Sequence, residues 1–319
     1  MPQHPTSSSS PPPFPSPPPL ITSATILLCT SLHLAFSAFD VPLFSFTLSP
    51  RSVLALVEPH RLLTSAVLHG GWLHLGMNMA STFVLSGSLE RKCGSLFLLH
   101  LVLLLTLLNS CLYVAVAYAG YLVGHSSLLT SHAVGYSGTI FALLSLQVGS
   151  EAGERSLWGA VTVSSKVYPW ALLVALQVLM PDVSFLGHLG GILVGRLAER
   201  GGLNALLPHP EYYRLASGAR GPLGRFAASP LYFAPPAAFA GFGRAGAGAC
   251  ADAGGMVTGA AGLLRDALAA AAHVLGCAGA GAGAGERWAR AGHNPDSGAG
   301  AAAVRRAEAA SLLAPPVHV

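Results

Sequence analysis

The chain has 319 residues, of which 52% are hydrophobic and only 9% are charged, whereas about a quarter of residues are charged in an ordinary soluble domain. This deficit excludes a water-soluble enzyme with a normal charged surface. The net charge of +4 is small and scattered, so it does not favour nucleic acid as a partner. The five cysteines show no CxxC pair and no regular spacing, which indicates neither a disulfide framework nor a zinc site.

Long stretches of the chain contain no Asp, Glu, Lys or Arg: residues 1–39, 62–89 and 93–150. A helix needs about 20 apolar residues to span the hydrocarbon of a bilayer, so the last stretch has room for two crossings. We therefore expect an all-α membrane protein that crosses the bilayer several times.

In chain order, residues 1–19 form a Pro/Ser-rich leader that we expect to be disordered. Residues 20–200 form the membrane domain, and their apolar segments predict six transmembrane helices near 20–38, 72–89, 95–122, 135–150, 167–180 and 185–198. With a cytosolic N-terminus, six basic residues of the connections lie on the cytosolic side and two, Arg51 and Arg61, on the other. This balance favours the N-terminus inside.

Residues 201–319 are rich in Ala and Gly and predict a cytosolic, low-complexity tail that is mostly disordered. The Ala-rich stretch 256–277 is a weak candidate for a seventh span, because Arg265 and Asp266 would lie in its middle.

Three of the apolar segments contain polar side chains. These are functional candidates, because a polar side chain in contact with lipid is unfavourable. His74 and Asn78 are four residues apart, so they lie on one face of the second helix. Ser137 follows Gly135-Tyr136 and precedes Gly138 at the start of the fourth helix, where free backbone N–H groups can stabilise an oxyanion. On its own this pattern is more often a packing motif of membrane helices.

The third group is His188, at the start of the sixth helix. It lies beside Gly187, Gly191 and Gly195, a stripe of small residues that lets another helix approach closely. A single histidine there is more often a hydrogen-bonded interior residue. In the expected topology, however, helices two, four and six all begin on the non-cytosolic side, so the three groups share one depth in the membrane.

Four sequence blocks resemble the rhomboid family of intramembrane serine proteases. They are RLLTSAVLHGGWLHLGMNM (61–79), LERKCGS (89–95), GYSGTIFAL (135–143) and GHLGGILVG (187–195). The resemblance covers roughly residues 20 to 200 and implies a six-helix rhomboid bundle. It is strongest to the endoplasmic-reticulum rhomboids of the rhomboid-domain-containing type.

The resemblance implies a Ser-His dyad, with Ser137 as nucleophile and His188 as general base and then acid. It also implies an oxyanion hole made by His74, Asn78 and the backbone N–H of Ser137. The implied supporting residues are Gly135, Gly138, Phe141 and Gly191; Phe141 lies one turn after Ser137 and can pack on the His188 ring. No metal or cofactor is implied.

The expected activity is endoproteolysis of single-pass transmembrane proteins in the lipid membrane, in the endoplasmic reticulum. Golgi and plastid membranes remain open alternatives. The competing hypothesis is a catalytically silent rhomboid relative that binds clients for endoplasmic-reticulum-associated degradation. Residues 304–314 weakly resemble a ubiquitin-interacting helix, but Arg305 and Arg306 replace its acidic opening. An unremarkable Ala-rich segment is therefore the favoured interpretation, and ubiquitin or degradation machinery is the alternative partner of the tail.

Overall fold

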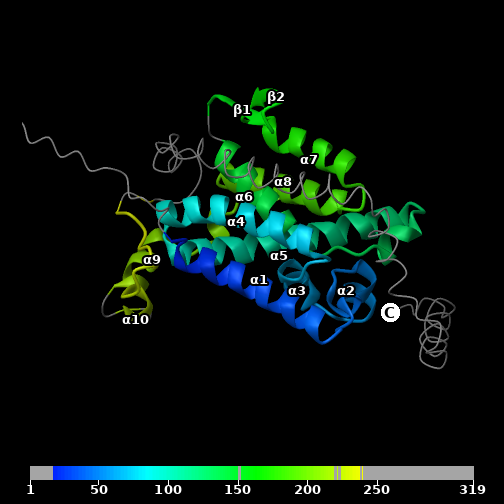
Figure 1. The fold of residues 1–319 in the computed structure, drawn as a ribbon, viewed down its shortest axis with the longest axis horizontal. Helices are drawn as coiled ribbons and strands as arrows, with labels where there is room; N and C mark the ends of the chain where they lie inside the picture. Colours follow the sequence, from blue (N-terminus) through cyan, green and yellow to red (C-terminus); the bar gives the residue numbers. More distant parts are fainter. Residues whose placement is uncertain (1–16, 150–151, 219–220, 222–223, 238, 240–319) are drawn as a thin grey trace, which may run out of the picture. The chain divides into compact units, whose positions relative to one another are not determined.

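A computed structural model describes residues 17–149, 152–218, 221, 224–237 and 239, all within one compact unit. The chain is mostly helical (Figure 1). Most of the leader, the stretch 256–277 and the stretch 304–314 lie outside the described residues. At the end of the leader, the carbonyls of Pro18 and Pro19 accept hydrogen bonds from the Ser23 hydroxyl and the Ser23 N–H.

Each of the six apolar segments contains a helix. They are α1 (Leu20–Ala38), α4 (Trp72–Cys93), α5 (Ser95–Leu122), α6 (Ser137–Gly149), α7 (Tyr168–Leu179) and α8 (Phe185–Glu199). Two boundaries differ from the predicted ranges by more than one residue. The α4 helix continues past residue 89 to Cys93, where Arg91 and Lys92 in the last turn suit the negative end of the helix dipole. The α6 helix begins at Ser137 rather than 135, because Gly135 has a φ of 114° that no right-handed helix accommodates.

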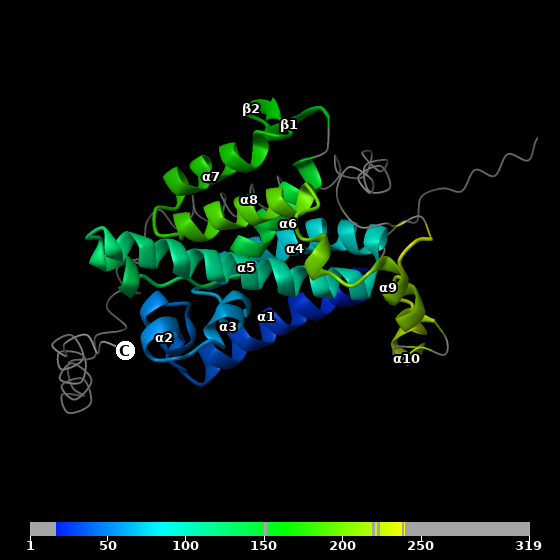
Figure 2. The same ribbon diagram turned by 180° about the vertical axis from the view of Figure 1, so that it is seen from behind.

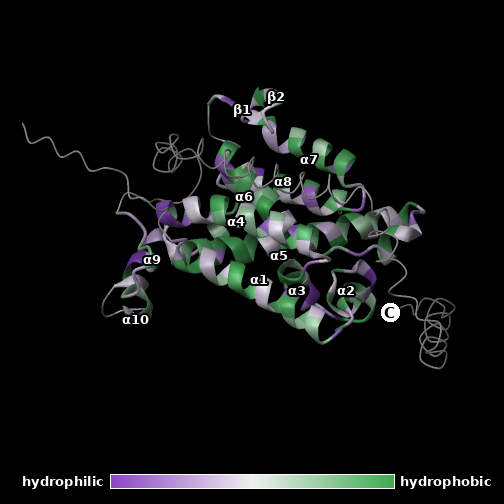
Figure 3. Cartoon of the chain, viewed as in Figure 1, coloured by the Kyte–Doolittle hydropathy of each residue, from purple (hydrophilic) through white to green (hydrophobic). Residues whose placement is uncertain are grey.

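Two of the described helices, α1 and α5, are long and apolar enough to cross a membrane, whereas α6 and α7 are shorter apolar helices. The 28 residues of α5 span about 42 Å, which exceeds the roughly 30 Å of bilayer hydrocarbon. Apolar residues predominate along α1, α5 and α7 (Figure 3). Six membrane crossings remain a prediction.

The α6 and α8 helices approach each other closely because their contact surface is built from glycine. A Cβ atom on Gly191 would collide with the Gly138 carbonyl oxygen, and one on Gly195 would collide with the Ala142 carbonyl oxygen. The glycine stripe expected on the sixth helix therefore packs on α6. In both views of the ribbon, α1 and α7 lie on opposite sides of this pair (Figures 1 and 2).

The connection between α1 and α4 is folded, which the sequence patterns did not predict. It contains η1 (Leu43–Phe46), α2 (Pro50–Ala55) and α3 (Arg61–Val67). Arg61 is only 6% exposed, and its guanidinium donates to Glu58 Oε2 and to the carbonyls of Phe44 and Thr47. One buried cation thus joins the segments of this connection.

A short antiparallel hairpin was also not predicted. Strands β1 (Glu154–Leu157) and β2 (Val161–Ser164) pair between α6 and α7, with Glu154 opposite Ser164. A 3-10 turn, η2 (Ser126–Thr130), follows α5.

The described part of the expected tail contains helices that the sequence analysis did not predict, whereas the prediction for the rest of residues 201–319 is not tested. They are η3 (Asn204–Leu206), α9 (Pro210–Ser217) and α10 (Gly224–Ala227). Tyr213 and Phe239 are buried and pack edge-on against Phe97 of α5. Because Ala and Gly dominate the composition of the whole tail, its few buried aromatic residues were not predicted. In Figures 1 and 2, α9 lies at the end of the bundle opposite α2 and α3.

Candidate active site

Ser137 and His188 are brought together by the close packing of α6 on α8. Ser137 is the first residue of α6, and His188 lies one turn into α8. The His188 Nε2 atom is 2.8 Å from the Ser137 Oγ atom, within hydrogen-bond distance. His188 is only 4% exposed. A hydroxyl and an imidazole at this distance can exchange a proton.

The position of His188 is fixed by the N-cap of α8 and by an aromatic contact to its ring. Ser184 caps this helix: its Oγ accepts from the Gly187 N–H at 3.1 Å, and its carbonyl accepts from the His188 N–H at 3.1 Å. The Phe141 ring stacks on the imidazole with centroids 4.6 Å apart. The Nδ1 atom is buried and has no hydrogen-bond partner among the described residues. In the described part of the chain, no carboxylate therefore hydrogen-bonds this nitrogen to form a triad.

The segment that precedes Ser137 is tied to the connection between α1 and α4. Leu48 and Ala133 exchange two backbone hydrogen bonds of 2.8 and 2.9 Å, and the Gly135 N–H donates to the Ser65 carbonyl at 2.9 Å. These bonds fix the path of the chain into α6. They explain how a helix can begin directly at the serine.

His74 and Asn78 face Gly135 from α4. A Cβ atom on Gly135 would lie 2.5 Å from His74 Cε1 and 3.4 Å from Asn78 Nδ2. Glycine is thus required here both for the positive φ and for this close approach. The Asn78 Nδ2 atom is buried without a hydrogen-bond partner in the described part of the chain, so an unused donor lies beside the serine's loop.

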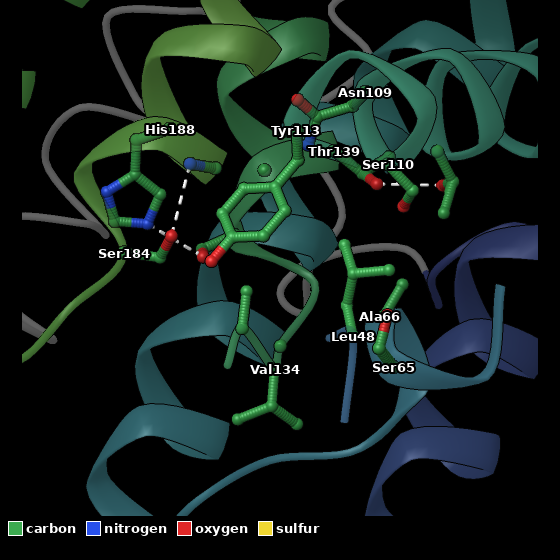
Figure 4. A pocket seen from close by; sticks show the side chains of 16 residues that line it. Leu48, Ser65, Ala66, Asn109, Ser110, Tyr113, Val134, Thr139, Ser184 and His188 are labelled. Carbon is green, nitrogen blue, oxygen red and sulfur yellow. Dashed lines mark hydrogen bonds between the residues drawn. The ribbon is translucent and has the colours of Figure 1, made fainter. Parts of the chain in front are cut away.

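A cavity with several polar groups adjoins the Ser137–His188 pair (Figure 4). His188 and Ser184 lie on one side of it, and Asn109, Thr139 and Ser110 on another. The remaining lining residues are Leu48, Ser65, Ala66, Thr106, Tyr113, Ala133, Val134, Gly135, Ser137, Gly138 and Gly187. His74 and Asn78 do not line this cavity.

The sequence analysis did not select Asn109, although a signal for it exists, because it is an amide in the middle of the long apolar helix α5. Its side chain reaches both helices of the pair: a Cβ on Gly138 would collide with Asn109 Nδ2, and one on Gly190 would collide with Asn109 Oδ1. The Oδ1 atom has no hydrogen-bond partner among the described residues. It is therefore an unused acceptor in the cavity wall.

The rhomboid domain pattern matches residues 57–203, which include α4, α6 and α8 and every residue predicted for the site. This chain carries a rhomboid domain. Members of the rhomboid family are membrane proteins, which agrees with the two candidate spans α1 and α5.

Curated relatives carry rhomboid names. Rhomboid-like protein 15 of Arabidopsis thaliana is 32% identical over 199 residues, covering 60% of this chain and 49% of that protein. Human Rhomboid-related protein 4 is 30% identical over 194 residues, covering 56% of this chain and 62% of that protein. Rhomboid-like protein 14, mitochondrial, of Arabidopsis is 32% identical over 149 residues, 46% of this chain and 44% of that protein. The matched part of this chain therefore covers between 44% and 62% of the length of these relatives.

Proposed function

We propose that this rhomboid is an intramembrane serine endopeptidase whose nucleophile is Ser137 and whose general base is His188. The observation that carries the proposal is the 2.8 Å contact between Ser137 Oγ and His188 Nε2 at the glycine-lined contact of α6 and α8. Serine is a poor nucleophile until a neighbouring base removes its proton, and neutral imidazole is suited to that task.

In the proposed reaction, Ser137 Oγ attacks the scissile carbonyl carbon while its proton passes to His188 Nε2. The same proton then goes to the leaving amine, which separates and leaves an acyl-enzyme. A water molecule, deprotonated by His188, hydrolyses the ester and regenerates the serine. Because His188 Nδ1 has no hydrogen-bond partner among the described residues, the base acts as half of a dyad.

The oxyanion of each tetrahedral intermediate needs hydrogen-bond donors that are already in place. We assign this role to His74, Asn78 and the Ser137 backbone N–H. The unpartnered Asn78 Nδ2 beside Gly135 supports the assignment. Gly135 and Gly138 leave room around the serine, Gly191 lets α8 approach α6, and Phe141 stacks on the imidazole.

Hydrolysis also needs water, which the core of a bilayer excludes. The cavity beside Ser137 offers polar partners that can hold water, including the Asn109 Oδ1 atom. We propose that this cavity supplies the water of the deacylation step.

The proposed substrates are single-pass transmembrane proteins whose helices unwind locally, because a serine can attack only extended backbone. The proposed compartment is the endoplasmic reticulum, with Golgi and plastid membranes as alternatives. One relative carries the word mitochondrial in its name, so the compartment is best tested directly, by imaging the tagged full chain against organelle markers.

The proposal is tested by co-expressing the full chain with a panel of epitope-tagged single-pass membrane proteins. Wild type is expected to release a fragment from at least one of them, and Ser137→Ala, inserted at an equal level, to release none. Equal cleavage by the two proteins would contradict the proposal. Stable binding of these proteins without cleavage by wild type would favour the silent client-binding relative instead.

A further inference from the structure

One histidine of α1 faces the bundle, although most residues of that helix are exposed or only half-buried. The buried residues of α1 are Thr22, Cys29 and His33, which form a single stripe along it. His33 is 7% exposed, and it lies outside the residues 57–203 that match the rhomboid domain. A polar ring turned inward from a membrane helix is a functional candidate.

The His33 ring contacts both ends of the turn that leads into α4. Its Nδ1 atom is 3.2 Å from the His69 carbonyl oxygen. Because a carbonyl only accepts, His33 must carry its proton on Nδ1 to make this bond. The same ring packs edge-on against Trp72, the first residue of α4, with centroids 4.5 Å apart.

The N-cap of α4 gives its first turn no side-chain hydrogen bond, because the N-cap residue, Gly71, has no side chain. His69 is buried, and burial, followed by the nearby His74 and His33 rings, lowers the pKa of His69 to about 3. The His69 side chain is thus neutral near pH 7, so it packs against its histidine neighbours without repelling them.

The position of this turn determines where His74 lies. His74 follows Trp72 by two residues, in the first turn of α4. Its ring packs on His69 with centroids 5.3 Å apart and closely approaches Gly135, two residues before Ser137. A shift of the turn would therefore move His74 relative to the serine.

We propose that His33 is a positioning residue for the candidate active site: its Nδ1–H bond to the His69 carbonyl holds the start of α4, and thereby His74, against Gly135. The inference that His33 affects catalysis rests on the proposed protease function. The inference that His33 holds the turn before α4 does not depend on that function.

Two substitutions separate the hydrogen bond from the ring. His33→Asn places an amide N–H close to the position of Nδ1, so it keeps the donor and loses the ring. His33→Phe keeps the ring contact with Trp72 and loses the donor. The control is His100→Asn, since His100 contacts Tyr212 and Tyr213 rather than α4.

Each purified protein is assayed for kcat and KM on a transmembrane peptide substrate and for hydrogen exchange of the amides of residues 68–74. His33→Phe is expected to lower kcat about tenfold with KM unchanged, because small displacements of catalytic groups cost rate. It is also expected to speed exchange at residues 68–74. His33→Asn is expected to keep both kcat and the exchange rates close to the wild-type values. His100→Asn is expected to change neither kcat nor exchange at residues 68–74.

Unchanged kcat and unchanged exchange in His33→Phe would overturn the proposal, and so would equal losses in His33→Phe and His33→Asn, which would assign the effect to the ring. If wild type itself cleaves nothing, the protease function fails. The exchange data still decide in that case whether His33 holds the turn.

Discussion

At one end of α4, the buried Glu90 carboxylate accepts hydrogen bonds of 2.6 to 2.8 Å from the N–H groups of Ile21 and Thr22 and from the hydroxyls of Thr22 and Ser95. At the other end, beside Ser137, buried polar atoms lack hydrogen-bond partners among the described residues. They are His188 Nδ1, Asn78 Nδ2 and Asn109 Oδ1.

Thr82 Oγ1 and Ser86 Oγ of α4 are also buried without a partner among the described residues, so the comparison is between the Glu90 carboxylate and the three atoms beside Ser137. Glu90 caps the start of α1, whose own N-cap residue, Pro19, supplies no side-chain bond, and links it to the start of α5. Residues 231–233 add to this end: the Leu20 N–H donates to the Leu231 carbonyl at 2.9 Å and the Ser95 N–H to the Phe233 carbonyl at 2.7 Å. An unpartnered buried polar group costs roughly 1–3 kcal/mol, so the groups near Ser137 lower the stability of the fold. Their retention there is consistent with a reaction that supplies the missing partners.

The largest expected effect is on activity at the Ser137 end. His188→Asn removes the general base while keeping a polar side chain of smaller size. We expect it to lower kcat by about 10⁴-fold or more, as loss of a member of a serine protease dyad or triad does. The measurement is cleavage of a transmembrane substrate by purified protein. Retention of one tenth of wild-type activity would show that another group removes the proton.

The next effect is on stability at the Glu90 end. Glu90→Ala leaves the buried Thr22 N–H and the partly buried Ile21 N–H without their acceptor, and we expect a loss of about 3 kcal/mol in the free energy of unfolding. Unfolding is followed by denaturant titration in detergent micelles. The matched control is Glu211→Ala, because the Glu211 side chain is 60% exposed and its ion pair with Arg214 is on the surface. A similar small loss in both variants would remove the stabilising role of Glu90.

Asn78→Ala tests the oxyanion assignment. Loss of one preorganised donor is expected to lower kcat about 100-fold, with stability unchanged or slightly raised because a buried unpartnered group is removed. The control on the same helix is Ser81→Ala, since the Ser81 hydroxyl donates only to the Met77 carbonyl of α4. Equal kcat values for wild type and Asn78→Ala would exclude Asn78 from the oxyanion hole.

The smallest expected effect is at the aromatic cluster of the tail. The Tyr213 hydroxyl is buried with no hydrogen-bond partner among the described residues. Tyr213→Phe should therefore change the free energy of unfolding by less than about 1 kcal/mol, whereas Tyr213→Ala should lower it by about 3 kcal/mol through lost packing on Phe97. If both variants unfold like wild type, residues 203–239 do not stabilise the bundle.

The helices and the candidate site residues could be predicted from the sequence, whereas the structure of the connections could not. Apolar segments located each of the six predicted helices, because apolar composition over such a length is a strong signal. The pairing of Ser137 with His188 followed from motif and topology. The His33 contact could not be predicted, because it depends on which face of α1 turns inward. The packing of Tyr213 and Phe239 was missed as well, because composition averaged over the whole tail concealed these anchors.

The hydroxyl of Ser137 can be tested directly by labelling the purified full-length protein with a fluorophosphonate probe and identifying the modified residue by peptide mass spectrometry. The proposed dyad predicts one adduct, on Ser137, that is lost in Ser137→Ala and strongly reduced in His188→Asn. An adduct on another residue, or labelling that persists in Ser137→Ala, would contradict the assignment of Ser137 as the nucleophile.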